Sequence, residues 1–144
     1  MFAVLYLALL LMSSGQAPDF CLFRPRHSSE VDTDRDASKR AETELSKAET
    51  AFDDARDAYH TGNIDKGDAD LDGMTKALHI CVDSLEAAHK ARYYKKAELR
   101  VANLQRRMAT LLDDIDLPRR GWAEQTNREL ETIHDKLLAG VMRK

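Results

Sequence analysis

Apolar residues recur along most of the chain at alternating intervals of three and four positions, the pattern of a helix with one buried face. The first series is Ala41, Leu45, Ala48, Phe52, Ala55 and Tyr59. The second series is Ile64, Gly67, Leu71, Met74, Leu78, Cys81 and Leu85. The third series is Tyr94, Ala97, Val101, Leu104, Met108, Leu111 and Ile115. The fourth series is Thr126, Leu130, Ile133, Leu137 and Val141. No alternating strand pattern appears, so the predicted fold class is all-α.

Two short sequences between these series predict reversals of the chain. Thr61-Gly62-Asn63 separates the first two series, and Gly and Asn tolerate the left-handed conformation at a helix end. Asp116-Leu117-Pro118 separates the last two, and proline is tolerated in the first turn of a helix but not in its interior. The expected architecture is therefore two antiparallel helical hairpins that form a four-helix bundle.

The join between the second and third series has two interpretations. No Gly or Pro lies between Gly73 and Pro118, so a single helix of about 50 residues is one alternative. However, Leu85 and Tyr94 are nine residues apart, and at about 100° per residue this spacing turns the apolar seam to the opposite face. A continuous helix would leave two hairpins with little shared core. We therefore expect a break between His89 and Tyr93.

The first residues predict export. Phe2 to Met12 is an unbroken apolar run, and the small residues after it end at Ala17, as in a secretory signal peptide with its cleavage site. The run is too short to span a bilayer, which takes about 20 apolar residues. No Lys or Arg precedes it, which leaves a misassigned start, or an apolar leader packed on the domain, as alternatives. We expect a signal peptide over residues 1–17, a linker over 18–33 and a helical bundle domain over 34–144.

This organisation places the mature protein in the periplasm or outside the cell, and limits its contact with the membrane to the transient one of the signal peptide. Cys21 is an improbable lipid acceptor because the bulky Phe20 precedes it. In an oxidising compartment Cys21 and Cys81 could form a disulfide. The alternative is a Cys81 buried in its apolar seam and an incidental Cys21.

Charge is segregated along the chain, although the net charge is only −3. Residues 30–72 hold fourteen acidic and six basic residues, whereas residues 76–107 hold three acidic and eight basic ones. The simplest consequence is ion pairing between neighbouring helices. The densest basic and aromatic cluster could also meet an anionic partner; it comprises Lys90, Arg92, Tyr93, Tyr94, Lys95 and Lys96. The negative net charge and the expected export argue against nucleic acid.

One stretch resembles the opening of a calcium loop. In Asp68-Ala69-Asp70-Leu71-Asp72-Gly73, alternate carboxylates could converge on one cation and the glycine would permit the sharp turn. The twelfth position, which should supply a bidentate Glu, is His79. The helical series from Ile64 to Leu85 also runs through this stretch without losing register. We therefore expect helix rather than a calcium loop here.

A second candidate metal site combines two Glu-x-x-His pairs. Glu86 with His89 and Glu131 with His134 place both side chains of each pair on one helix face. Two such pairs with a Glu from each remaining helix form the di-iron site of ferritin-like bundles, and Glu49 and Glu98 are the available residues. The pairs lie at the edges of the apolar seams, so we expect His134 to be hydrogen-bonded or half-exposed instead.

Nothing in the sequence predicts nucleophilic or phosphate chemistry. Ser38, Ser46 and Ser84 have no glycine elbow near them, and no histidine stands in a recognisable relation to either cysteine. A glycine-rich phosphate loop is also absent from the sequence. We expect no enzyme activity, no catalytic residue and no resident cofactor.

Residues 55–67 resemble the turn of a tetratricopeptide helix pair. Ala55, Gly62, Asn63, Ile64 and Gly67 match that family in kind, whereas the aromatic Tyr59 is one place out of phase and no 34-residue repeat follows. The resemblance implies the geometry of a helix pair and no peptide-binding array. More broadly, residues 55–67, 94–100 and 133–142 are similar to uncharacterised exported bacterial helical proteins, which have no activity to carry over.

The predicted function is a non-catalytic, exported helical bundle that acts through protein contacts or self-association. Heptad spacing gives affinity for helices, but the same spacing arises when every seam residue is used in the internal core. The alternative is a metal-binding bundle, di-iron-like through Glu86, His89, Glu131 and His134 or calcium-binding through its Asp residues.

Overall fold

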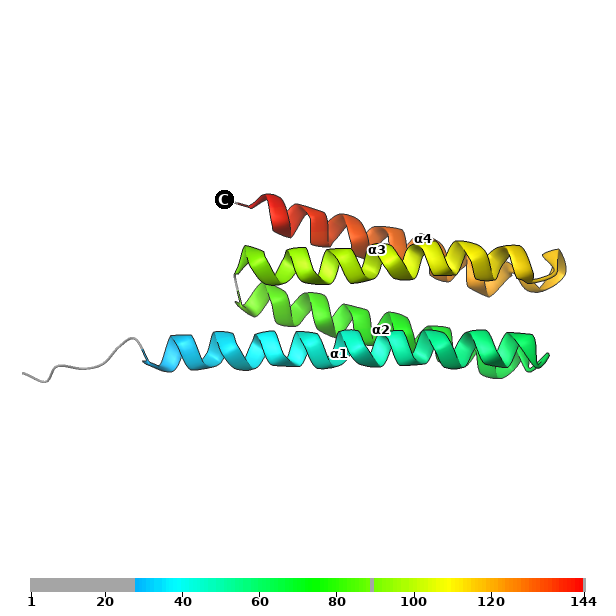
Figure 1. The fold of residues 1–144 in the computed structure, drawn as a ribbon, viewed down its shortest axis with the longest axis horizontal. Coiled ribbons are helices and arrows are strands. Elements are labelled where there is room, and N and C mark those ends of the chain that lie inside the picture. Colours follow the sequence, from blue (N-terminus) through cyan, green and yellow to red (C-terminus); the bar gives the residue numbers. More distant parts are fainter. Residues whose placement is uncertain (1–27, 89, 144) are drawn as a thin grey trace, which may run out of the picture.

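The computed structural model describes residues 28–88 and 90–143, with side chains from residue 32 onward. Four helices follow one another: α1 (Ser28–His60), α2 (Ile64–Ala88), α3 (Ala91–Asp114) and α4 (Gly121–Met142), with a short 3-10 turn η1 (Leu117–Arg119) before the last. No strand occurs among the described residues. The predicted all-α class is confirmed (Figure 1).

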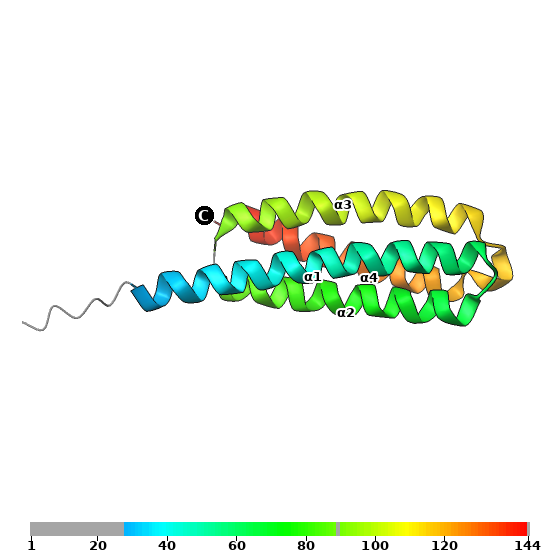
Figure 2. The ribbon, with the colours of Figure 1, turned by 60° about the horizontal axis from the view of Figure 1, so that its bottom comes forward.

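The four helices form two antiparallel hairpins packed on each other. The α1–α2 and α3–α4 hairpins each have extensive internal packing, and between hairpins α2 packs on α4 and α1 lies beside α3. The α2 and α3 helices therefore occupy opposite corners of the bundle, and the connection between them crosses its end diagonally (Figure 2). This is the expected four-helix bundle.

The break between α2 and α3 lies where the phase of the apolar seams predicts it. The second helix ends at Ala88, Lys90 is extended with φ −114° and ψ 110°, and the third begins at Ala91. A single continuous helix is therefore wrong. The apolar seam changes to the opposite face between Leu85 and Tyr94. Because the helix is broken there, α2 and α3 can both turn their apolar sides into the common core.

The apolar series become the core. Every member of the first and third series is buried, as are the members of the second from Gly67 onward. In the fourth series the expected Val141 is only half-buried and Gly140 takes the buried position. The reason lies in the neighbouring helix, since the ring of Tyr94 occupies the space over Gly140.

The two reversals also form as expected. Gly62 has φ +80°, and the amide of Asn63 donates to the carbonyl of Ala58 at 2.8 Å, so the left-handed residue closes the end of α1. The Asn63 side-chain oxygen then accepts the amide of Lys66 at 3.3 Å and caps α2. At the other reversal, Arg120 Nε donates to the carbonyl of Ile115 at 2.6 Å and secures the end of α3.

The first helix begins earlier than the predicted domain boundary at residue 34. It starts at Ser28, within the expected linker, and its first turns project beyond the end of α2 (Figure 2). Residues 28–33 carry no apolar series in the sequence, so local periodicity did not indicate this part of the helix. The predicted signal peptide of residues 1–17 lies outside the described residues. None of the described helices combines the length and the apolarity needed to cross a membrane.

Candidate functional site

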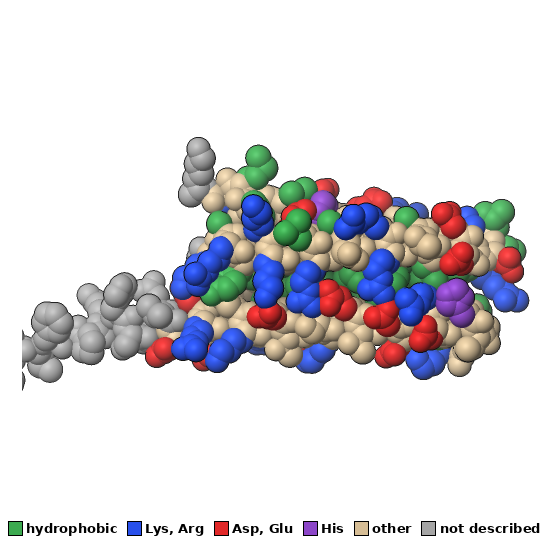
Figure 3. Space-filling model, viewed as in Figure 1, with side chains coloured by type: hydrophobic (Ala, Val, Ile, Leu, Met, Phe, Trp, Pro, Cys, Tyr) green, Lys and Arg blue, Asp and Glu red, His purple; other side chains and the backbone are tan. Residues whose placement is uncertain are grey.

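A ladder of ion pairs joins α1 to α3. The acidic residues come from α1, and the basic ones come from α3 or, for Lys90, from the position just before it. The pairs are Asp34–Lys90, Glu42–Lys96, Glu49–Arg100 and Asp53–Arg107. The numbers rise together on both helices because α1 and α3 run parallel. Figure 3 shows the charged side chains meeting along this seam over an apolar floor. The predicted pairing between neighbouring helices is confirmed.

Arg100 makes the best-defined contacts of the ladder. Its Nε donates to Glu49 Oε1 at 2.8 Å and its Nη2 to Glu49 Oε2 at 2.5 Å, a bidentate pair, and Nη2 also reaches Ser46 Oγ at 3.2 Å. Hydrogen bonding to Glu49 raises the pKa of Arg100, with partial burial acting in the opposite direction. Two fixed bonds between planar groups define a register, so this pair aligns α1 with α3.

We expect Glu49 and Arg100 to be energetically coupled. A double-mutant cycle with Glu49→Gln and Arg100→Met should give a coupling of about 1 kcal/mol, the upper range for a partly exposed pair. The measurement is urea unfolding at low and high salt, and the coupling should shrink as salt rises. The i,i+4 pair Lys76–Asp72, which lies within one helix and is more exposed, is the matched control with a smaller expected coupling. Equal coupling in the two pairs would contradict a positioning role for Arg100.

Below the ladder lies a small cavity of about 50 Å³ lined mainly by Ala41, Leu45, Cys81, Leu85 and Ala97. Cys81 is 1% exposed and carries a free thiol. Burial raises the pKa of this thiol to about 12. A protonated, enclosed thiol is a poor nucleophile, so Cys81 has the properties of a core residue. Cys21, the other half of the predicted disulfide alternative, lies outside the described residues.

The thiol of Cys81 should therefore resist modification in the folded protein. In a Cys21→Ser variant, an alkylating reagent at neutral pH should add to Cys81 only when denaturant unfolds the chain, as intact mass reports. In a Cys81→Ala variant, labelling of Cys21 by the same reagent is the control that the reagent is active. Rapid labelling of Cys81 without denaturant would contradict the buried position.

The calcium-like stretch is helical throughout, because residues 68–73 lie inside α2. Each of its carboxylates has its own partner: Asp68 accepts the Tyr59 hydroxyl, Asp70 pairs with Lys66 at 2.6 Å and Asp72 with Lys76 at 2.7 Å. The three carboxylates therefore do not converge on a common point. The prediction of helix in place of a calcium loop is confirmed.

The six candidate di-metal residues are largely dispersed. Among the five whose side chains the structure describes, Glu98 and His134 alone come together, with His134 Nε2 at 3.0 Å from Glu98 Oε1 on the α3–α4 side of the bundle. Glu49 binds Arg100, Glu131 accepts from Asn127 at 3.1 Å and Glu86 is exposed. The side chain of His89 lies outside the described residues. Over residues 28–88 and 90–143, no three His, Cys, Asp or Glu side chains are grouped as metal ligands.

A second His–Glu contact was not predicted. His79 Nε2 of α2 lies 2.8 Å from Glu129 Oε1 of α4. The two residues are 50 positions apart, and no local pattern links them. Together with Glu98–His134, this pair places a hydrogen-bonded histidine on each flank of α4, where α4 meets α2 and α3.

The basic and aromatic cluster divides between the interior and the surface. Tyr94 is buried over Gly140, whereas Lys90 and Lys96 belong to the ladder. Tyr93 accepts a hydrogen bond from Arg92 Nη2 at 2.7 Å, and that guanidinium lies 4.7 Å from the ring centroid. Lys95 is exposed. Within the cluster, Lys90 and Lys96 join the hairpins, Tyr94 packs within the second hairpin, and Arg92 and Lys95 are exposed.

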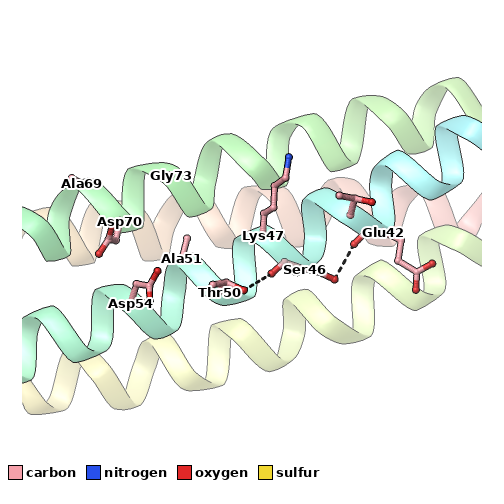
Figure 4. A pocket seen from close by; sticks show the side chains of 10 residues that line it. Glu42, Ser46, Lys47, Thr50, Ala51, Asp54, Ala69, Asp70 and Gly73 are labelled. Atoms are coloured by element: carbon pink, nitrogen blue, oxygen red, sulfur yellow. Dashed lines mark hydrogen bonds between the residues drawn. The ribbon is translucent and has the colours of Figure 1, made fainter.

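A shallow groove of about 620 Å³ runs over the outer side of α1 and α2 (Figure 4). Most of the side chains along it are small, and its lining is Glu42, Thr43, Ser46, Lys47, Thr50, Ala51, Asp54, Ala69, Asp70 and Gly73. The hydroxyls of Ser46 and Thr50 each donate to the backbone carbonyl four residues earlier, both at 3.1 Å. Each of these hydroxyl protons is thus directed at a backbone carbonyl and not at a side-chain base.

The exposed large apolar side chains are unevenly distributed. Among the described residues they are Leu99, Leu117, Trp122, Leu138 and Met142, all of which lie on the second hairpin. Leu117 and Trp122 flank the reversal between α3 and α4, whereas Leu138 and Met142 lie on the last turns of α4. The first hairpin contributes none of them, so the two outer surfaces differ in chemistry.

Comparison with known proteins found no matching family model, no matching curated protein and no matching solved structure. The resemblance of residues 55–67 to a tetratricopeptide turn stays a prediction. In this turn the ring of Tyr59 packs close to Gly67, where an added Cβ would lie 2.9 Å from the ring.

Proposed function

We propose that this chain is a non-catalytic, exported helical bundle that acts through protein contacts made by its second hairpin. The observation that carries the proposal is that, among the residues with described side chains, the exposed large apolar ones all lie within residues 99–142. Trp and Met are enriched at protein interfaces, and exposed apolar side chains along the length of one hairpin favour a contact site on that hairpin.

Polar chemistry in the described part of the molecule is used internally, which also favours this proposal. Each buried side-chain nitrogen or oxygen in that part has a hydrogen-bond partner. The best ion pairs connect α1 to α3, and the two His–Glu contacts connect α4 to its neighbours. These groups hold the helices in register and leave the surface to recognise a partner.

Site-specific photo-crosslinking tests the proposal. A photoreactive phenylalanine derivative in place of Leu138 or Trp122 should give discrete protein adducts in the native host. The same group in place of Asp83, exposed on α2, is the control and should give none. Adducts of equal yield at all three positions, or at Asp83 alone, would contradict a contact site on the second hairpin.

Elemental analysis separates this proposal from the metal-binding alternative. Protein purified without chelators is expected to contain no stoichiometric iron, manganese or calcium. Iron or manganese at one or two atoms per chain, lost in a His134→Ala variant but kept in a His60→Ala variant, would favour the alternative. His60 is the control because it is exposed and lies at the far end of α1.

The export part of the proposal rests on the apolar run that ends at Met12 and the small residues after it. N-terminal sequencing of the protein recovered from its native host should begin at Pro18. Replacing Ala17 by a bulky residue such as Trp should leave the leader attached. A native chain that begins at Met1 would contradict export by cleavage.

A further inference from the structure

The two hairpins carry opposite net charges. Residues 28–88 contain sixteen acidic and seven basic residues, whereas residues 90–143 contain eight acidic and twelve basic ones. The ladder between α1 and α3 uses only part of this charge. The remainder lies on outer surfaces, so the molecule has an acidic and a basic side.

The basic side includes a narrow apolar and cationic strip on α3, which we call the Leu99 face. Leu99 is 60% exposed and is flanked by Lys95, four residues before it, and Arg106, seven residues after it. This spacing puts the three side chains on one outward side of the helix. Within the described part of the chain, Lys95 and Arg106 form no ion pair. They are therefore free to meet an external acidic group.

The acidic side includes the groove between α1 and α2. Glu42, which is exposed and also pairs with Lys96 of its own chain, lines one end of the groove. Asp54, which is exposed, and Asp70, which pairs with Lys66, line the other. Its middle is open, because a Cβ added at Gly73 would meet no atom within 4 Å. Lys47 also lines the groove but pairs with Glu44 at 2.7 Å. The groove thus offers a small-residue floor with carboxylates at both ends (Figure 4).

We propose that the Leu99 face of one copy docks into the α1–α2 groove of a second copy of this chain. Lys95 and Arg106 are eleven residues apart, about 16 Å along a helix, and Glu42 and Asp54 are twelve apart, about 18 Å. In the complex one cation meets Asp54, the other shares the exposed Glu42 with Lys96, and Leu99 enters the open middle. A helix with one projecting Leu fits a floor of small side chains because the backbones can approach closely.

The two surfaces belong to different hairpins on opposite layers of the bundle (Figure 1). Each copy therefore contacts one neighbour through its Leu99 face and another through its groove. Such head-to-tail association produces a ring or an open chain. This inference rests on the proposed function, since it names a second copy as the partner of a contact protein.

Sedimentation of the mature chain over micromolar to submillimolar concentrations tests the proposal. The weight-average mass should rise with concentration, and high salt should weaken the association because exposed ion pairs are screened. A Leu99→Glu variant and a Gly73→Arg variant should each self-associate with a dissociation constant at least tenfold higher than that of the wild type. Asp83→Arg, outside both surfaces, is the control and should associate like the wild type.

Mixing the two variants provides the decisive outcome. The Leu99→Glu copy keeps an intact groove and the Gly73→Arg copy keeps an intact Leu99 face, so the mixture should form a one-to-one dimer and nothing larger. Far-ultraviolet circular dichroism verifies that both variants are folded. A monomeric wild type, a mixture that stays monomeric, or a dimer insensitive to either substitution would overturn the proposal. A monomeric wild type together with discrete crosslinks at Leu138 would overturn self-association alone and leave the proposed function standing.

Discussion

Replacing Phe52 by alanine is expected to lower the free energy of unfolding by about 3–5 kcal/mol, the largest effect of any single change considered for this bundle. Phe52 is 1% exposed and is among the largest fully buried side chains. Its ring also lies 4.6 Å from the guanidinium carbon of Arg107 on α3. Removal of the ring leaves a cavity in α1 and takes away a contact with the second hairpin.

Chemical unfolding followed by circular dichroism measures this loss. Phe52→Leu is the matched control, because it keeps most of the apolar volume and removes only the ring. It should lose no more than about 1.5 kcal/mol. A loss in Phe52→Ala of below about 1 kcal/mol would contradict the close packing of this site.

Gly140→Ala is expected to destabilise the protein by about 1–3 kcal/mol, although alanine is the better helix former. The added Cβ would overlap the ring of Tyr94, which packs on Gly140 across the α3–α4 interface. Tyr94 is buried, so its ring has little space into which to move. Overpacking therefore outweighs the gain in helix propensity.

Gly73→Ala is the matched control for this prediction. Gly73 also lies inside a helix, and an added Cβ there meets no atom within 4 Å. This substitution should stabilise the protein by about 0.5–1 kcal/mol. Combining Gly140→Ala with Tyr94→Leu should recover part of the lost stability. A stabilised Gly140→Ala variant would contradict the contact with Tyr94.

These two predictions concern different kinds of contact, one between the hairpins and one within the second hairpin. Phe52 and Arg107 lie on the α1–α3 side, where the apolar core is bordered by ion pairs. Gly140 and Tyr94 lie on the α3–α4 side, where the backbone of one helix comes close to an aromatic ring of the other. The first contact depends on apolar area and the second on shape, so they should respond differently to salt and to volume changes.

Much of the fold could be predicted from the sequence, because helical periodicity is a local property. An apolar residue every three or four positions has to lie on one side of a helix, and burial of that side removes it from water. Every member of the series from Ala41 to Tyr59 and from Tyr94 to Ile115 is buried, although Ser38 and Ala58 of α1 are buried too without belonging to a series. The phase change between Leu85 and Tyr94 likewise predicted the break, because a helix turns by a constant angle per residue.

Candidate sites were less predictable, because a site depends on the register between helices. The Glu-x-x-His motifs placed Glu131 beside His134 in the sequence, yet His134 lies against Glu98 of another helix. Which carboxylate lies opposite a histidine is decided by how far one helix slides along its neighbour. That displacement follows from the packing of all the core side chains and is encoded in no single motif.

The sequence by itself determined the all-α class, the two reversals and the identity of most core residues, since each follows from local spacing and turn chemistry. The segregation of charge also predicted that neighbouring helices would pair, without indicating which residues would meet. Only the tertiary structure decided that α1 lies beside α3 in the register of Arg100 with Glu49, and that Gly140 is the buried position beneath Tyr94. It also decided that exposed apolar side chains remain on the second hairpin alone among the described residues. The physical reason is that long-range contacts depend on the simultaneous packing of four helices, which no local pattern specifies.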